Sequence, residues 1–218
     1  MRPFKAAIFD MDGTLIDSNG AWEQINRLYL GRHGISLGDE ELQKFASMTF
    51  EEVAQHFIHV LHIPTTVEEL IRDCNDMIIE QYRSRIPLKP HALEYLHALR
   101  DRGIKIALAT ASSARLYTAA LENHGIHGLF DAFATTEEAG RGKEFPDVYL
   151  LAAEKMEVRP EECAVFEDIL RGVQSAKAAG MQAVGVYDFY SEPRREAIQA
   201  IADRYIQDFS EMMDFACI

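Results

Sequence analysis

The chain has few of the features that mark membrane, secreted or thiolate-metal proteins. Its 218 residues include only three cysteines, Cys74, Cys163 and Cys217, without CxxC spacing. This pattern predicts reduced thiols and argues against a disulfide framework or a zinc site. The apolar runs are a handful of residues long, whereas a helix that spans a bilayer needs roughly 20. Residues 1–5 show neither the apolar stretch nor the cleavage pattern of a signal peptide.

Positive charge is also scarce. The chain carries 22 Lys and Arg against 35 Asp and Glu, a formal net charge of −13, and Arg194–Arg195 is its longest basic run. Because nucleic-acid binding needs a basic patch, we expect a protein that does not bind nucleic acid. The reduced thiols and the short apolar runs predict a cytoplasmic protein that does not contact a membrane. A small anionic substrate stays compatible with this charge, since the field of a site can differ from the global one. The distribution of charge along the chain does not distinguish a monomer from an oligomer.

The chain does have the composition of a soluble globular protein, with 48% apolar and 26% charged residues. Its length suits one large domain or one domain with a smaller insert. A first apolar strand is predicted over residues 5–10. Residues 18–86 follow with helical periodicity and no convincing strand. Within this block Thr66 and Glu69 have the spacing of a capping box. Two prolines in 86–90 then interrupt helicity and predict a linker.

After Pro90 the pattern changes to an alternation of helices and strands. Strands are predicted over 104–109, 131–135, 163–166, 182–187 and 204–209, and helices over 92–102, 116–124, 146–156, 172–179 and 192–202. Such alternation produces right-handed crossovers and a parallel sheet with helices on both faces. We therefore predict an α/β fold in which a helical insert separates the first strand from its sheet in sequence only.

Two carboxylates lie one residue apart at the end of the first predicted strand. Asp10 and Asp12 follow the apolar run 6–9 and precede Gly13 and Thr14. Carboxylates this close repel each other and lose hydration unless a cation or a substrate engages them. Two interpretations fit these residues equally: a hard-metal site that contains a nucleophile, and an acidic turn shaped by Gly13.

Other predicted strands also end in polar residues. Thr110 follows the strand 104–109, and Glu167 and Asp168 follow the strand 163–166. In open parallel sheets the functional site lies at the carboxyl ends of the strands, so these residues should converge with the first carboxylate pair. Lys143, alone, would be an ordinary residue of a surface turn. The helix after it leads into the strand that ends at Asp168, which predicts that Lys143 lies at the same edge.

This combination of side chains suits a phosphate ester. A carboxylate that attacks phosphorus forms an acyl phosphate and divides one difficult displacement into two easier ones. A magnesium ion held by carboxylates would mask its negative charge. The lysine and the hydroxyl would hold the equatorial oxygens, and a second carboxylate would protonate the leaving alkoxide and then activate water.

The four motifs, taken in order, resemble the haloacid dehalogenase superfamily, specifically its helical-cap members that include phosphatases and β-phosphoglucomutase. The motifs are Asp10–Ser18, Thr110–Ser113, Gly142–Asp147 and Phe166–Asp168. The resemblance implies a Rossmann-like catalytic core formed by residues 1–16 and 87–218 and a helical cap domain formed by residues 17–86. It also implies a magnesium-dependent phosphohydrolase that acts on a small phosphorylated metabolite through an aspartyl-phosphate.

The resemblance further implies a role for each carboxylate. Asp10 would be the nucleophile and a metal ligand, and Asp12 the general acid and base, with its backbone carbonyl on the metal. Asp168 would complete the magnesium site. Glu167 would also belong to the metal site, but adjacent residues of an extended segment point to opposite sides, so it would reach the ion through water or a bend.

The remaining implied roles concern the phosphate. Thr110 and the following backbone amide, that of Ala111, would bind it, and Lys143 would neutralise its charge. The chain departs from the common family pattern at Glu144 and Phe145, where Glu144 could pair with the lysine.

Three alternative functions compete with hydrolysis. Dehalogenation of carbon is disfavoured by Asp12 and the acidic pair. A sugar-phosphate mutase is the closer alternative; in that family an arginine of the cap helps to hold the substrate, and the corresponding segment 47–52 has none. A non-catalytic phosphate or metal sensor is disfavoured because Asp10 and Asp12 are both present.

The cap is expected to confer substrate selectivity by closing over the site. Trp22 lies near enough to Asp12 in sequence to reach a substrate, but its helical spacing with Ile25 and Tyr29 predicts a place in the core of the cap. The apolar stripe from residue 71 to 82 predicts cap core as well.

Overall fold

A parallel six-stranded sheet forms the centre of the computed structural model, which describes residues 1–214 apart from the side chains of residues 43, 46 and 47. Cys217 and the end of the apolar C-terminal tail lie outside the described residues. The strands are β1 (Ala6–Phe9), β2 (Lys105–Thr110), β3 (Ala132–Thr135), β4 (Cys163–Glu167), β5 (Gln182–Val186) and β6 (Arg204–Ile206). Their order is β3-β2-β1-β4-β5-β6, and all neighbouring pairs are parallel.

The first strand lies in the middle of this sheet. All four residues of β1 are buried, and Phe9 is in register with Leu108 of β2 on one side and Phe166 of β4 on the other. A strand covered on both faces needs a continuous apolar sequence, which is what residues 6–9 provide. The strand order reverses between β1 and β4, so a crevice opens at their carboxyl ends.

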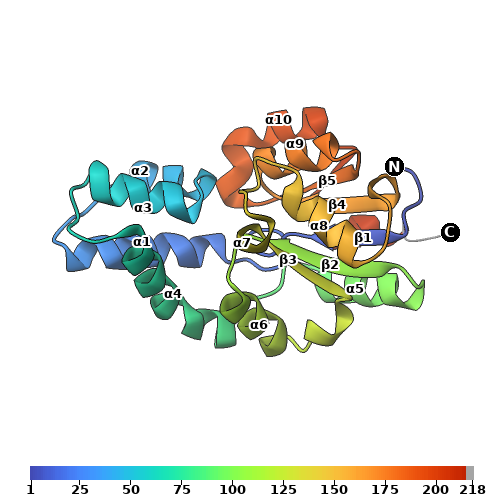
Figure 1. Ribbon diagram of the computed structural model, residues 1–218, viewed down its shortest axis with the longest axis horizontal. Helices are drawn as coiled ribbons and strands as arrows, with labels where there is room; N and C mark the ends of the chain where they lie inside the picture. Colours follow the sequence, from blue (N-terminus) through green and yellow to red (C-terminus); the bar gives the residue numbers. More distant parts are fainter. Residues whose placement is uncertain (215–218) are drawn as a thin grey trace.

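Helices cover both faces of the sheet, as the alternating pattern predicted (Figure 1). Helices α5 and α6 lie on one face, and α8, α9 and α10 lie on the other. The bounds of these helices are α5 Ala92–Asp101, α6 Ala114–Asn123, α8 Asp147–Lys155, α9 Leu170–Ala178 and α10 Arg195–Ile201. The predicted α/β fold with a parallel sheet is therefore confirmed.

Between β1 and α5 the chain forms a separate layer of helices at one end of the sheet (Figure 1). We call residues 17–86 the helical insert; its helices are α1 Asn19–Arg32, α2 Asp39–Gln43, α3 Phe50–His59 and α4 Val67–Ser84. The capping box predicted for α4 is confirmed, because Thr66 Oγ1 accepts from the Glu69 amide and Glu69 Oε2 accepts from the Thr66 amide. None of the described helices is both long and apolar enough to cross a bilayer. The cytoplasmic location stays a prediction.

The two segments that join the insert to the sheet run side by side. The Lys89 amide donates to the Leu15 carbonyl at 2.8 Å, and the Asp17 amide donates to the Pro87 carbonyl at 2.9 Å. Ile16 and Leu88 form an antiparallel bridge between these two bonds. Pro87 therefore lies in a paired strand-like connection, which holds the insert at a defined place beside the end of β1, and Pro90 lies in the turn that precedes α5.

Three predicted elements differ from the structure. Residues 189–194 form a 3-10 helix before α10, because Pro193 has no amide to donate and disfavours a regular α-helix there. The last strand ends at Ile206 and is followed by a 3-10 helix, Phe209–Met212, in which Phe209 and Met212 are buried. A one-turn helix, α7 (Thr136–Ala139), follows β3 where no helix was predicted.

Candidate active site

Three buried carboxylates meet where β1 and β4 end. Asp10 directly follows β1, and its amide donates to the Phe166 carbonyl of β4 at 3.0 Å, which locks the two strand ends together. Glu167 and Asp168 come from the end of β4. One carboxylate oxygen from each of Asp10, Glu167 and Asp168 lies within 4.8 Å of the others. The convergence expected from the parallel strands is thus present.

Lys143 is the cation inside this cluster. Its side chain is buried, and Nζ donates to Oδ1 of Asp10 and to Oε1 of Glu167. Burial lowers the pKa of Lys143, but attraction to Asp10 and Glu167 outweighs burial and raises it above its ordinary value. Lys143 therefore stays charged and holds Asp10 in one orientation.

Glu167 is held by several donors. Besides Lys143, its Oε1 accepts from the Tyr149 hydroxyl at 2.7 Å, and its Oε2 accepts from the Ile169 amide at 3.3 Å. Gly172 makes room for it, since a Cβ on that residue would lie 2.4 Å from the Glu167 carboxyl carbon. Most of the acceptor capacity of Glu167 is therefore used by the protein itself.

The other two carboxylates of the cluster, Asp10 and Asp168, both have raised pKa values. Burial raises the pKa of Asp10 to about 7, although Lys143 acts in the opposite direction. Burial also raises the pKa of Asp168 well above its usual range, reinforced by the charges of Glu167 and Asp10. Such shifts mark carboxylates that need a positive charge for ionisation at neutral pH.

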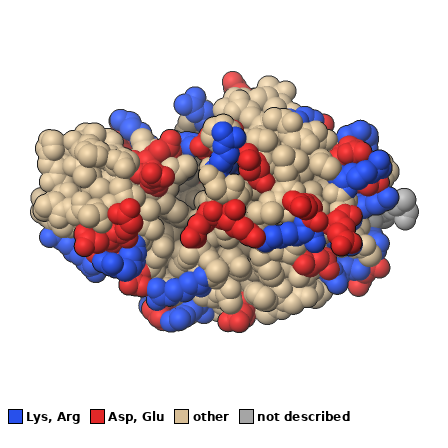
Figure 2. All heavy atoms as spheres, viewed as in Figure 1, with Lys and Arg blue, Asp and Glu red and all other residues tan. Residues whose placement is uncertain are grey.

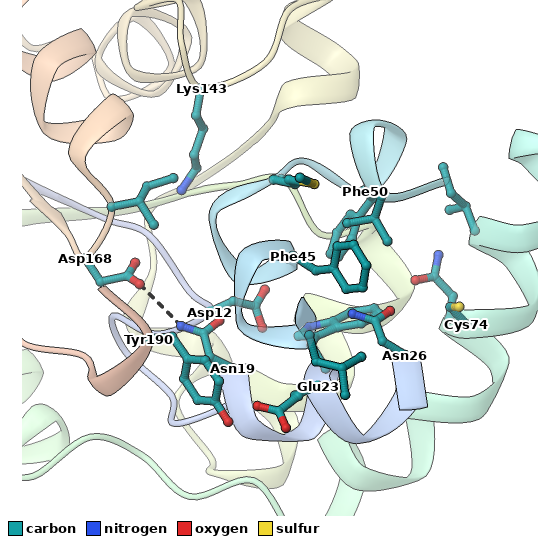
Figure 3. Close-up of a pocket in the computed structure, with 18 of the residues that line it drawn as sticks. Asp12, Asn19, Glu23, Asn26, Phe45, Phe50, Cys74, Lys143, Asp168 and Tyr190 are labelled. Carbon is teal, nitrogen blue, oxygen red and sulfur yellow. Dashed lines mark hydrogen bonds between the residues drawn. The ribbon is translucent and has the colours of Figure 1, made fainter. Parts of the chain in front are cut away.

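Asp168 is oriented by donors from the start of the chain. Thr14 Oγ1 lies 3.1 Å from Asp168 Oδ1, and Asn19 Nδ2 donates to Asp168 Oδ2 at 3.3 Å (Figure 3). Gly13 passes close by with φ of 81°, and a Cβ there would lie 2.4 Å from Asp168 Oδ2. Gly13 is therefore required both for its backbone angle and for its close approach.

Asn19 is itself anchored by a second buried carboxylate. Its Nδ2 donates to Asp188 Oδ1 at 3.0 Å, and Asp188 Oδ2 accepts from Lys89 Nζ at 2.6 Å. Lys89 belongs to the paired connection between the insert and the sheet. The contacts that hold this connection therefore also help to orient Asp168, through Asp188 and Asn19.

The side chain of Asp12 lies apart from the three-carboxylate cluster and is surrounded by hydroxyl groups. Oδ1 accepts from Ser18 Oγ at 2.6 Å and from the Tyr82 hydroxyl, and Oδ2 accepts from Ser112 Oγ at 2.7 Å. These donors come from the start of the insert, from α4 and from the loop after β2. Asp12 is therefore oriented by residues from both the insert and the sheet.

Tyr82 reaches Asp12 from the last turns of α4. It is fully buried, and its oxygen accepts from the Trp22 indole N–H at 2.8 Å. Burial, together with the neighbouring charge of Asp12, raises the pKa of Tyr82 well above its ordinary value. The hydroxyl therefore stays protonated and donates a hydrogen bond to Asp12. Trp22, expected in the core of the insert, is only half-buried and lines the cavity described below.

Two of the predicted phosphate-binding residues lie at the end of β2: Thr110 is its last residue and Ala111 follows it. The Thr110 hydroxyl is buried and accepts from the Ser112 amide at 3.0 Å. Ala111 is exposed and lines the same cavity as Asp10, Asp12 and Lys143. The loop thus presents Ala111 to the cavity while Thr110 shapes the turn behind it.

A cavity extends from these side chains into the helical insert, with ≈ 1020 Å³ of empty space that includes its open mouth. In Figure 3, Asp168 and Lys143 lie at one side of it and Asn26 and Cys74 at the other. Figure 2 shows acidic side chains on both sides of the hollow between the insert and the sheet. A ligand attached to phosphorus beside Asp10 would project toward the insert.

The carboxylate cluster fits a hard divalent cation. Asp10 and Asp168 offer only oxygen atoms, both are buried, and the described cluster contains neither a cysteine nor a histidine. Mg²⁺ prefers oxygen ligands, usually one or two carboxylates completed by water and phosphate oxygens. A cation here would also favour the ionised forms of the two carboxylates whose pKa values are raised.

Several residues of the site carried no assigned role in the sequence. Ser112 and Thr14 lie inside the motifs, so their hydroxyls could have been noticed there. Tyr82 lies far from every motif and Tyr149 lies just after the motif Gly142–Asp147; both stand in apolar helical patterns that predict core. Their contribution depends on where α4 and α8 pack, which no local pattern encodes.

Comparison with known proteins agrees with this geometry. Residues 4–180 match the family described as haloacid dehalogenase-like hydrolase. Hexitol phosphatase A from Escherichia coli (strain K12) is 32% identical over 213 residues, which cover 90% of this chain and 89% of that protein. A bifunctional riboflavin kinase/FMN phosphatase from Arabidopsis thaliana is 29% identical over 206 residues, and the chain spans only 53% of its length.

Solved structures share the fold. CbbY from Rhodobacter sphaeroides, in complex with phosphate, superposes with a TM-score of 0.85 over 96% of each chain at 26% sequence identity. The similarity thus covers both the sheet and the helical insert.

Proposed function

Because the chain belongs to the haloacid dehalogenase-like hydrolase family, we propose that it is a magnesium-dependent phosphatase that cleaves a small phosphomonoester through an aspartyl-phosphate. One observation carries this proposal: buried Asp10 contacts Lys143, lies beside Asp168, and faces the same cavity as Asp12. The phosphatase names of relatives such as hexitol phosphatase A support it.

In the first step a carboxylate oxygen of Asp10 attacks phosphorus, and the bond between phosphorus and the ester oxygen breaks. Asp12, in its protonated form, gives its proton to the leaving alkoxide. Lys143 offsets the charge on the transferring phosphoryl group, and the Ala111 amide adds a hydrogen-bond donor at the cavity wall. The products are a free alcohol and a phosphoryl group on Asp10.

In the second step water attacks the phosphoryl group, and Asp12, now ionised, accepts its proton. The bond between phosphorus and Asp10 breaks, which releases inorganic phosphate and restores both carboxylates. The three hydroxyls around Asp12 hold its carboxylate in one orientation through both transfers.

Asp10, Asp168 and the backbone carbonyl of Asp12 would hold Mg²⁺, which supplies charge neutralisation for the nucleophile and the phosphate. We assign Glu167 a different task. Since Lys143, Tyr149 and the Ile169 amide already use its oxygens, Glu167 orients Lys143 and contacts the ion at most through water.

The mutase alternative gains no support from the cavity. A mutase must hold a phosphosugar in two orientations, which needs a cation at the insert end of the cavity. Among its described lining residues Lys143 is the one Lys or Arg, and it lies beside Asp10.

Phosphate release from a phosphomonoester panel, with Mg²⁺ and with chelator, tests the proposal. Asp10→Asn should lower release by about 10³-fold or more, as loss of a catalytic nucleophile does. Asp17→Asn is the matched control, because Asp17 lies in the same segment but is exposed. Release that survives Asp10→Asn would refute the nucleophile assignment, and release that is equal in chelator would refute the metal requirement.

A further inference from the structure

The part of the cavity inside the helical insert, which we call the insert chamber, has a predominantly apolar wall. Helices α1, α3 and α4 and the segment between α2 and α3 contribute Trp22, Phe45, Met48, Phe50, Leu70 and Ile71. Apolar walls favour a ligand that buries carbon surface, because that surface leaves water on binding.

The aromatic members of the wall present rings rather than polar atoms. The indole N–H of Trp22 is donated to Tyr82, so the ring itself faces the insert chamber as apolar surface. Phe50 packs against it with ring centroids 4.6 Å apart and planes tilted by 45°. A flat ring can stack or pack edge-on against such a pair.

No Lys or Arg among the described residues of the insert lines the insert chamber. Lys143 is the one Lys or Arg among the described residues that line the cavity, and it is engaged with Asp10 and Glu167 at the phosphorus end. Arg171, at the start of α9, is ion-paired with Glu52 of α3 at 3.2 Å and is not part of the lining. A second phosphate or a carboxylate on the ligand would lose hydration in the insert chamber without a partner of opposite charge.

Two amide side chains offer a limited set of polar contacts. Asn26 of α1 and Asn75 of α4 line the insert chamber, and no hydrogen bond joins either side chain to another described residue. Glu23 of α1 also lines the cavity, but its Oε1 already accepts from Arg27 at 3.1 Å. Asn26 lies on the side far from Asp168 and Lys143 (Figure 3). Two amides can satisfy one or two groups on the edge of a ring, but not the row of hydroxyls of an open-chain sugar alcohol.

We propose that the substrate is a phosphomonoester whose alcohol carries an aromatic or similarly flat apolar ring, with one or two hydrogen-bonding groups on its edge and no second anionic group. This inference rests on the proposed phosphatase function and narrows it. Hexitol phosphates and sugar bisphosphates should be the poorer substrates.

The test compares kcat/KM with Mg²⁺ for four compounds. Benzyl phosphate and 3-hydroxybenzyl phosphate carry the ring without and with an edge hydroxyl, sorbitol 6-phosphate carries a polyol, and fructose 1,6-bisphosphate carries a second anion. We expect each ring ester to exceed both sugar esters by at least about 10-fold, the range by which an apolar pocket discriminates. Equal or higher kcat/KM for either sugar ester would overturn the proposal.

A binding readout does not depend on turnover. Trp22 is the only tryptophan of the chain, so emission from the Asp10→Asn variant reports directly on the insert chamber. Benzyl phosphate should change this emission saturably and at lower concentration than sorbitol 6-phosphate. The reverse order of affinities would overturn the proposal.

A pair of variants tests whether the wall of the insert chamber determines the preference for ring esters over sugar esters. Ile71→Asn adds an amide to the wall of the insert chamber and should narrow the ratio of kcat/KM between benzyl phosphate and sorbitol 6-phosphate by about 10-fold. Ile58→Asn is the matched control, because Ile58 of α3 is equally half-buried but does not line the cavity. An unchanged ratio in Ile71→Asn would contradict the assignment of the wall.

Acetyl phosphate has an acetyl group too small to fill the insert chamber. It therefore distinguishes an error in the proposed substrate class from an error in the proposed phosphatase function. Hydrolysis of acetyl phosphate and of sugar esters, with poor hydrolysis of ring esters, overturns the substrate class and leaves the phosphatase function standing. No Mg²⁺-dependent hydrolysis of any of the five compounds would count against the phosphatase function and the substrate class together.

Discussion

Each carboxylate around the cavity has different neighbours, and this difference separates their roles. Asp10 contacts a buried lysine, Asp168 accepts from neutral donors, and Asp12 accepts from three hydroxyls. The charge of Asp10 is therefore partly offset within the protein, whereas we propose that a bound cation offsets the charge of Asp168. In the proposed mechanism Asp12 exchanges protons with the substrate and the attacking water.

Tyr82→Phe removes one donor from Asp12 and also removes the acceptor of the Trp22 indole N–H. A hydrogen bond to a charged group contributes roughly 1.5–3 kcal/mol, so we expect kcat to fall about 10-fold or more while KM changes little. Steady-state kinetics on the best panel substrate measures both constants.

Tyr95→Phe is the matched control for Tyr82→Phe. Tyr95 is also fully buried, but its hydroxyl makes no hydrogen bond to the described protein. Its removal should leave kcat unchanged and leave the melting temperature equal or higher, since an unpaired buried hydroxyl disfavours the folded state. Equal losses of kcat in both variants would contradict a specific contact between Tyr82 and Asp12.

Asp12→Ala tests the division of labour between the two carboxylates of the first motif. Loss of a general acid and base lowers turnover by roughly 10²–10⁴-fold. Because only the backbone carbonyl of Asp12 is assigned to the metal, calorimetric titration should find Mg²⁺ affinity nearly unchanged. A large loss of Mg²⁺ affinity would place the Asp12 side chain on the ion instead.

The raised pKa of Asp10 also affects stability. In the absence of metal, the folded protein holds a proton on this carboxyl up to about pH 7, whereas the unfolded chain loses it near the ordinary value of 3.8. Between these values the folded state binds more protons, so this group's contribution to stability decreases as pH rises. Urea unfolding in chelator should show that decrease, and Asp10→Asn should weaken it; a slope unaffected by the substitution would contradict the shift.

At the scale of elements, the parts encoded by local patterns were predictable. The strand ends that carry Asp10, Thr110 and Asp168 follow short apolar runs bounded by polar residues, and the register of the parallel sheet then brings them together. The 3-10 helix around Pro193 and the short last strand were missed in part. Their form depends on proline and on the packing of Phe209 and Met212, not on periodicity.

The capping box of α4 gives a prediction at this scale. Thr66→Ala removes the side-chain acceptor for the Glu69 amide and should lower the free energy of unfolding by about 1 kcal/mol. Thr66→Ser keeps the hydroxyl and should restore most of that loss. Urea unfolding measures both, and equal stability of the alanine variant and the native protein would contradict the cap.

At the scale of the whole molecule, the sequence indicated the fold and the chemical end of the cavity but not the walls of the insert chamber. Asp10, Asp168 and Lys143 lie in or beside strand ends whose position follows from topology. Trp22 and Tyr82 lie in amphipathic helices, where spacing gives one buried face but does not distinguish core from cavity wall. That distinction comes from how α1 and α4 pack on each other and on the end of the sheet.

Metal binding should stabilise the entire chain, because both proposed carboxylate ligands are buried in the folded state and dispersed in the unfolded one. Saturating Mg²⁺ at 100 times its dissociation constant would add about 2.7 kcal/mol to the free energy of unfolding. Asp168→Asn should abolish most of this increment, measured as the shift in melting temperature between Mg²⁺ and chelator. An undiminished shift in Asp168→Asn would place the ion elsewhere.

The most direct measurement is the identification of the covalent intermediate. Protein mixed with substrate and Mg²⁺ is quenched in acid within one turnover and digested, and the peptides are weighed by mass spectrometry. The account predicts one added phosphoryl group on the peptide that contains Asp10, more of it in Asp12→Asn with acetyl phosphate, and none in Asp10→Asn. A phosphoryl group on another residue, or undiminished phosphate release by Asp10→Asn, would contradict it.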